Sequence, residues 1–178
     1  MKTPREARSL LAAWSVLALE RRSTSAVTSY LPPPGIPDVT FNGTPLTMRI
    51  LELKAMRGPN YWSVKRHQLI VMRLDIEDLE QKPTDKIPGF YDRIKELLPS
   101  MYSHRCSEEH EGGFWERVKR GTWMGHVIEH IALEIQTLAG METGFGRTRS
   151  TRERGVYNVV FSYVEEPVGM FAAKAAVR

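Results

Sequence analysis

GTWMGHVIEHIALEIQTLAG, residues 121–140, has the hydrophobic spacing of an amphipathic helix. An α-helix turns about 100° per residue, so its apolar residues gather on one side. These residues are Val127, Ile128, Ile131, Ile135 and Leu138, together with Met124, Ala132 and Ala139. Thr122 can cap the start of the helix, and Gly140 ends it. The stretch therefore predicts a helix that covers a hydrophobic core.

The opposite side of this predicted helix carries His126, Glu129, His130 and Glu134. Two imidazoles four residues apart can bind one zinc ion. The order HxxEH is that of inverted zinc peptidases, in which Glu129 would be the general base. Glu134 is a candidate third ligand by helix geometry, and a distant acid such as Glu52 or Glu153 is an alternative. The same spacings also form ordinary surface pairs between glutamate and histidine, so the pattern leaves both interpretations open.

Three β-rich runs lie outside this helix, at residues 48–56, 67–76 and 155–164. In the first, MRILELKAM, alternation places Ile50 on one side of the pleat and Leu51 and Leu53 on the other. The second, HQLIVMRLDI, is apolar in its centre and predicts an interior strand. Further helices are predicted within 87–101 and 111–121. Because helices are grouped between strands, we expect an α+β fold, with a small mixed or antiparallel sheet and helices packed on one face.

Residues 1–47 are predicted to be a disordered leader and linker. A basic start and a short apolar run, Leu10 to Leu19, are followed by charges and then by a segment rich in proline, glycine, serine and threonine. Met48 could be the true start of translation. The domain itself is expected over residues 48–164, and residues 165–178 read as a helix that has just begun.

The charge, the cysteine count and the absence of certain motifs limit where this protein is expected to act and what it is expected to bind. The 178 residues carry a net charge of +4 and one cysteine, Cys106. A single cysteine excludes an internal disulfide framework and favours a reducing compartment, so we expect a cytoplasmic protein. There is no apolar run that could span a bilayer and no nucleic-acid motif, so neither a membrane nor a nucleic acid is an expected partner.

Two segments combine cationic residues with aromatic residues or glycine. RGPNYWSVKRH, residues 57–67, could grip a polymer that bears carboxylates or guanidinium groups, or its Tyr61 and Trp62 could cover the edge of the sheet. GFGRTRSTRERG, residues 144–155, is predicted to be a basic loop in which Arg147 and Arg149 could hold an anion. HRCSEEH, residues 104–110, has no recognised metal spacing and is predicted to be a loop.

From about Met48 to its end the chain resembles the N-terminal domain of cyanophycin synthetases. The segments that carry the resemblance are MRILELKAMRGPNYWSVKRHQLIVMRLDIEDLEQKP, IPGFYDRIKELLPS, GGFWERVKRGTWMGHVIEHIALEIQTLAGM and GFGRTR…GVYNVVFSYVEEPVGMFAAKAAVR. Cyanophycin synthetases are ATP-dependent ligases that build a polymer with an aspartate backbone and an arginine on each side chain. Their N-terminal domain precedes an ATP-grasp domain and a Mur-ligase-like domain.

The resemblance implies a domain that holds cyanophycin during synthesis. The expected polymer-binding residues are Arg57, Tyr61, Trp62, Arg66, Arg147 and Arg149. ATP and Mg²⁺ would belong only to the ligase domains, which this sequence lacks, so the final helix would lead towards an absent ATP-grasp domain or the chain would work with ligase domains in trans. Some members also trim the polymer into primers at a metal-dependent site, which Glu129, His126 and His130 fit. A zinc-dependent hydrolase is therefore the alternative function.

Overall fold

The computed structural model describes residues 40–41, 44–45, 47–65 and 68–178. Arg66 and most of the expected leader, residues 1–47, lie outside the described residues. β1 (Thr40–Phe41) and β2 (Thr44–Pro45) pair antiparallel in a unit separate from the one that starts at residue 46. The second unit contains all the predicted site residues that the structure describes.

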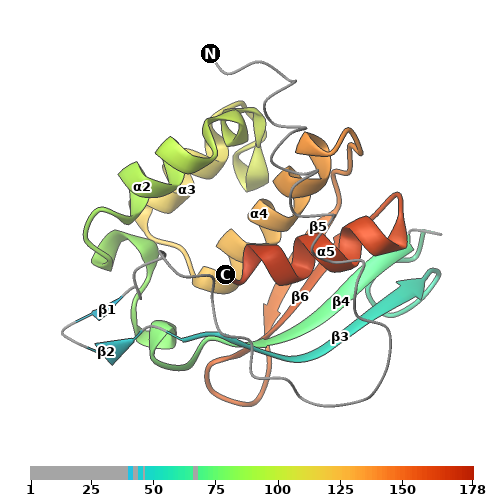
Figure 1. Cartoon of the computed structure of the whole chain (residues 1–178), viewed down its shortest axis with the longest axis horizontal. Coiled ribbons are helices and arrows are strands. Elements are labelled where there is room, and N and C mark those ends of the chain that lie inside the picture. Colours follow the sequence, from blue (N-terminus) through green and yellow to red (C-terminus); the bar gives the residue numbers. More distant parts are fainter. Residues whose placement is uncertain (1–39, 42–43, 46, 66–67) are drawn as a thin grey trace, which may run out of the picture. The chain divides into compact units, whose positions relative to one another are not determined.

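An antiparallel sheet forms the base of the second unit (Figure 1). Among the described residues it has four strands, in the spatial order β3 (Arg49–Arg57), β4 (Gln68–Asp75), β6 (Val156–Ser162) and β5 (Gly146–Ser150). β4 is the apolar interior strand that its composition predicts. The expected α+β class is confirmed, and the sheet is antiparallel.

The prediction that residues 144–155 form only a basic loop is wrong for its first half. Gly146–Ser150 is the edge strand β5, which pairs with β6 from Gly146 opposite Phe161 to Ser150 opposite Tyr157. The sequence GRTRS has no apolar alternation, because one face of this edge strand is exposed and the other lines a polar site. Hydrophobic periodicity therefore could not reveal it.

The prediction that Leu51 and Leu53 share one face of β3, opposite Ile50, is also wrong, because the strand contains a β-bulge. The pairing register shifts between Ile50 and Glu52, so Leu51 has no partner residue on β4. An extra residue reverses the alternation of all the residues that follow it. Ile50 and Leu53 consequently pack against the same hydrophobic core, whereas Leu51 is 45% exposed.

Helices cover one face of the sheet, as predicted. Figure 1 shows α4 (Met124–Leu138) and α5 (Glu166–Ala176) side by side above the strands, with α2 (Phe90–Leu97) and α3 (Gly113–Arg120) beyond them. Short 3₁₀ helices join these elements: η1 (Glu77–Gln81), η2 (Thr84–Lys86), η3 (Pro99–Ser103) and η4 (Cys106–Glu108). The helix expected near the end of the chain is thus confirmed as α5. None of the described helices combines the length and hydropathy needed to span a bilayer.

The apolar side of α4 packs onto the sheet, with Val127 and Ile128 buried in the main core. The polar side is buried as well: the exposed fractions of Glu129, His130 and Glu134 are 6%, 7% and 1%. The expectation that Thr122 caps the helix is wrong. Trp123 occupies the N-cap position without a side-chain hydrogen bond, and the Thr122 hydroxyl bonds to His126 instead.

Candidate metal centre

A cleft of about 1240 Å³ opens beside the polar side of α4. Three elements supply the residues of the candidate centre. α4 contributes His126, Glu129 and His130, β5 contributes Thr148, and η4 contributes Cys106. Segments far apart in the sequence therefore meet around one space.

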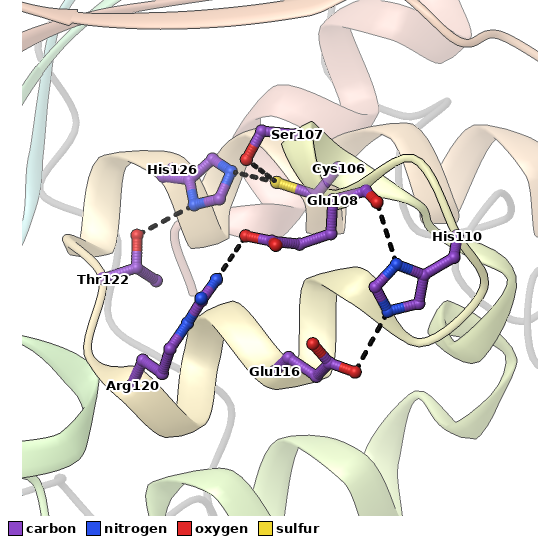
Figure 2. Close-up of polar contacts among 8 residues, drawn as sticks. All are labelled: Cys106, Ser107, Glu108, His110, Glu116, Arg120, Thr122 and His126. Carbon is purple, nitrogen blue, oxygen red and sulfur yellow. Dashed lines mark hydrogen bonds and ion pairs between the residues drawn. The ribbon is translucent and has the colours of Figure 1, made fainter.

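Cys106 lies against the two helix histidines. Its Sγ is 3.2 Å from His126 Nε2 (Figure 2). One potential ligand atom from each of Cys106, His126 and His130 lies within 4.8 Å of the others. The backbone of Cys106 has a φ of +55°, a conformation that costs a non-glycine residue about 1–2 kcal/mol. Sequence reasoning missed this residue because it precedes His126 by 20 positions, and no short motif has that spacing.

The segment that carries Cys106 is tied to α3. Phe114 N donates to His104 O at 3.2 Å, and a Cβ at Gly113 would lie only 2.2 Å from Arg105 O, so glycine allows this close approach. Figure 2 shows two ion pairs that hold the same segment: Arg120 with Glu108, and His110 with Glu116. The position of the thiol is thus set by contacts with α3.

The unprotonated form of His126 is favoured. Its Nδ1 lies 2.9 Å from Thr122 Oγ1, so Nε2 is the nitrogen turned to Cys106. Burial and, to a smaller extent, the positive charge of Arg117 lower the pKa of His126 to about 4. A neutral imidazole is the form that binds a metal ion.

His130 lies deeper, with the Phe114 ring 4.4 Å from its own ring centre to centre. Burial lowers the pKa of His130 far below its ordinary value, and the nearby His126 and His104 lower it further. His130 Nδ1 lies 2.9 Å from His104 Nδ1. His130 is therefore also neutral, and one of its nitrogens is occupied by His104.

Glu134 lies at the other side of His104. Its Oε2 is 2.9 Å from His104 Nε2, and its Oε1 accepts a hydrogen bond from Ser100 Oγ. Burial raises the pKa of Glu134, but these hydrogen bonds outweigh burial, and the net pKa is lowered. The structure brings Cys106, and not Glu134, into ligand range of both helix histidines.

The two distant acids proposed as alternative ligands have other partners. Glu52 pairs with Lys54 at 2.7 Å, and Glu153 pairs with Arg73 at 2.6 Å.

Glu129 points from α4 to β5. Its Oε2 accepts a hydrogen bond from Thr148 Oγ1 at 2.6 Å. A Cβ at Gly146 would lie 2.2 Å from Glu129 Oε1, so the carboxyl group occupies the space that a side chain at residue 146 would need. Burial raises the pKa of Glu129 to about 7, against the lowering effect of the Thr148 hydrogen bond. This carboxyl group can both accept and release a proton near neutral pH.

Comparison with known proteins identifies the family. The cyanophycin synthase-like N-terminal domain matches residues 71–178. The chain belongs to this family. It is 60% identical over 131 residues to the cyanophycin synthetase of Crocosphaera subtropica, 58% to that of Geminocystis herdmanii and 56% to that of a Synechocystis species. The alignments cover 74% of this chain and 15% of each relative, so the chain spans only a small part of the proteins it matches.

The residues expected to bind polymer in this cyanophycin synthase-like domain fall into two groups. Tyr61 is 79% exposed, and its hydroxyl oxygen accepts a hydrogen bond from Arg149 Nη1 at 3.4 Å. Arg147 lines the cleft, and its guanidinium group lies 5.8 Å from the centre of the Phe145 ring. β5 thus connects the exposed Tyr61 to the cleft.

Trp62 and Arg57 are placed differently. Trp62 is half-buried and packs on the second apolar face of the sheet, against the cluster Leu69, Val71 and Val160. This contact agrees with the alternative interpretation, in which Trp62 covers the sheet. Arg57 is exposed at the end of β3.

Proposed function

We propose that this domain binds cyanophycin and hydrolyses it at a zinc centre formed by Cys106, His126 and His130, with Glu129 as general base. The observation that supports the proposal is the convergence of these four side chains in one cleft. A binding surface alone does not need a sulfur ligand beside two neutral imidazoles.

The ligand set suits zinc. A thiolate and two neutral imidazoles are among its preferred protein ligands, and catalytic zinc sites use three protein ligands with a fourth position open. When two ligand atoms are each bonded to the same tetrahedral zinc ion at about 2.0–2.3 Å, the two atoms lie about 3.5 Å from each other. The 3.2 Å separation of Cys106 Sγ and His126 Nε2 fits that value. A bound zinc ion would supply Lewis-acid activation of water and of the scissile carbonyl group.

Glu129 supplies the proton transfers. In hydrolysis of an amide, the C–N bond breaks, the oxygen of water bonds to the carbonyl carbon, and one water proton reaches the leaving nitrogen. With a pKa of about 7, Glu129 can take that proton and then deliver it. Thr148 holds the carboxyl group on the cleft side of α4.

The cleft lining suits a polymer with both charges. Arg105, Arg117 and Arg147 line it together with Glu142. Arginine binds carboxylates through paired hydrogen bonds, and a carboxylate binds guanidinium groups in the same way. A chain of aspartates that bear arginines presents both kinds of group.

The test uses the purified chain with cyanophycin. We expect zinc to copurify, soluble oligomers to appear with time, and Glu129→Gln to bind zinc but release no fragments. If wild-type protein loaded with zinc leaves the length of the polymer unchanged, the hydrolase proposal is wrong.

The second candidate function is polymer holding without cleavage, with ligase domains supplied in trans. The observation that favours it is the exposed Tyr61–Arg149 pair next to Arg147. Tyr61→Ala and Arg149→Ala should then weaken sedimentation with cyanophycin granules. Arg93→Ala, which removes an exposed arginine paired with Glu96 on α2, is the matched control. Equal sedimentation of all three variants would contradict this candidate.

A further inference from the structure

Four side chains form a continuous hydrogen-bonded row behind the proposed zinc centre. Ser100 Oγ donates to Glu134 Oε1, Glu134 Oε2 lies 2.9 Å from His104 Nε2, and His104 Nδ1 lies 2.9 Å from His130 Nδ1. Glu134 is 1% exposed and the His104 side chain is 12% exposed. The hydrolysis described above uses neither residue.

The partners in the row favour one tautomer for each histidine. A carboxylate can only accept hydrogen bonds, so the hydrogen between Glu134 and His104 must be on His104 Nε2. In the tautomer with its one hydrogen on Nε2, His104 has a lone pair on Nδ1, which can accept a hydrogen bond from His130 Nδ1. His130 Nε2 is left with a lone pair, and it is the nitrogen of His130 not engaged by His104.

We propose that Glu134 and His104 are positioning residues that select the metal-binding tautomer of His130. The inference rests on the proposed zinc centre and places two residues, His104 and the ligand His130, between Glu134 and the metal. A carboxylate that orients a ligating histidine typically contributes ten- to hundredfold to metal affinity. Here an intervening imidazole transmits that orientation.

The proposal is tested by zinc affinity and by the tautomers themselves. Zinc dissociation constants would be measured by competition with a chromophoric chelator for wild type, Glu134→Leu, Glu134→Gln and Ser100→Ala. We expect Glu134→Leu to bind zinc ten- to hundredfold more weakly. Glu134→Gln, which keeps an acceptor oxygen at the same place, should recover part of the loss, and Ser100→Ala should show a smaller loss. Gln136→Met is the control, because Gln136 is also buried on α4 but bonds to Ser162 O.

¹⁵N NMR spectra of the imidazole nitrogens in zinc-loaded wild type report directly which ring nitrogens of His104 and His130 carry hydrogen, without any substitution. We expect hydrogen on His104 Nε2 and on His130 Nδ1. Hydrogen on His104 Nδ1, or unchanged zinc affinity in Glu134→Leu, would overturn the positioning role while leaving the zinc centre intact. Wild-type protein that binds no zinc would overturn both the centre and the inference that rests on it.

Discussion

Thr148 Oγ1 donates a 2.6 Å hydrogen bond to Glu129 Oε2, and so joins edge strand β5 to helix α4 in the lining of the cleft. This bond lowers the pKa of a carboxyl group that burial alone would raise further. Strand β5, which the sequence pattern did not predict, therefore lowers the pKa of the proposed general base.

Thr148→Val should shift the titration of Glu129 to higher pH. The valine keeps the shape of threonine but cannot donate a hydrogen bond to the ionised carboxylate, so the charged form loses a stabilising partner. We expect a rise of roughly one pKa unit. The measurement is ¹³C NMR of the labelled Glu129 carboxyl group. Thr137→Val is the control, because Thr137 bonds to Leu133 O on its own helix, and it should leave the titration unchanged.

In the metal-free protein, the free energy of unfolding of Glu129→Gln relative to that of wild type should increase as the pH rises from about 4.5 to 7. In this window the folded protein holds a proton on Glu129 that the unfolded chain has released, so wild-type stability falls as the pH rises. The full difference is about 3 kcal/mol. Urea unfolding in the presence of a chelator would measure it.

His126 and His130 have the opposite effect on the pH dependence of stability. Their folded pKa values are lowered, so the stability they contribute is lost as the pH falls below about 6.5. Because both proteins contain these histidines, their effect cancels in the comparison of wild type with Glu129→Gln. A stability difference that does not grow between pH 4.5 and 7 would contradict the raised pKa.

Cys106→Ser should lose most of the zinc affinity. Saturating zinc at a thousand times its dissociation constant raises the free energy of unfolding by about 4 kcal/mol. In Cys106→Ser this stabilisation should largely disappear at the same zinc concentration, because zinc prefers thiolate to hydroxyl. Thermal unfolding with and without zinc would measure the change. Thr137→Val, at a cleft residue whose hydroxyl bonds to Leu133 O, should behave as wild type. Equal zinc stabilisation in Cys106→Ser would remove Cys106 from the ligand set.

Gly146→Ala should impair hydrolysis and leave zinc binding unchanged. The new Cβ would lie 2.2 Å from Glu129 Oε1 and must displace the carboxyl group, whereas it is not directed at the three ligands. Displacing a reacting group by about 1 Å can cost a hundredfold in rate. Gly144→Ala is the control, because a Cβ there meets nothing within 4 Å. Similar turnover in both variants would show that Glu129 is not the base.

The helix of residues 124–138 and its histidines could be located from sequence because the information is local. Residues three and four positions apart on a helix must share a side. The same logic predicted strand β4 from its apolar centre. It failed at β3, where a single bulge residue, Leu51, reverses the alternation, and at β5, whose polar composition carries no periodic signal.

By itself the sequence determined the α+β class, the family, and the placement of His126, Glu129 and His130 on one side of a helix. Only the tertiary structure decided that Cys106 completes the cluster, that Glu134 contacts His104, and that Thr148 holds Glu129. The physical reason is distance along the chain. Contacts separated by 19 to 30 residues depend on how helices, turns and sheet edge pack together, and short-range periodicity contains no record of that packing.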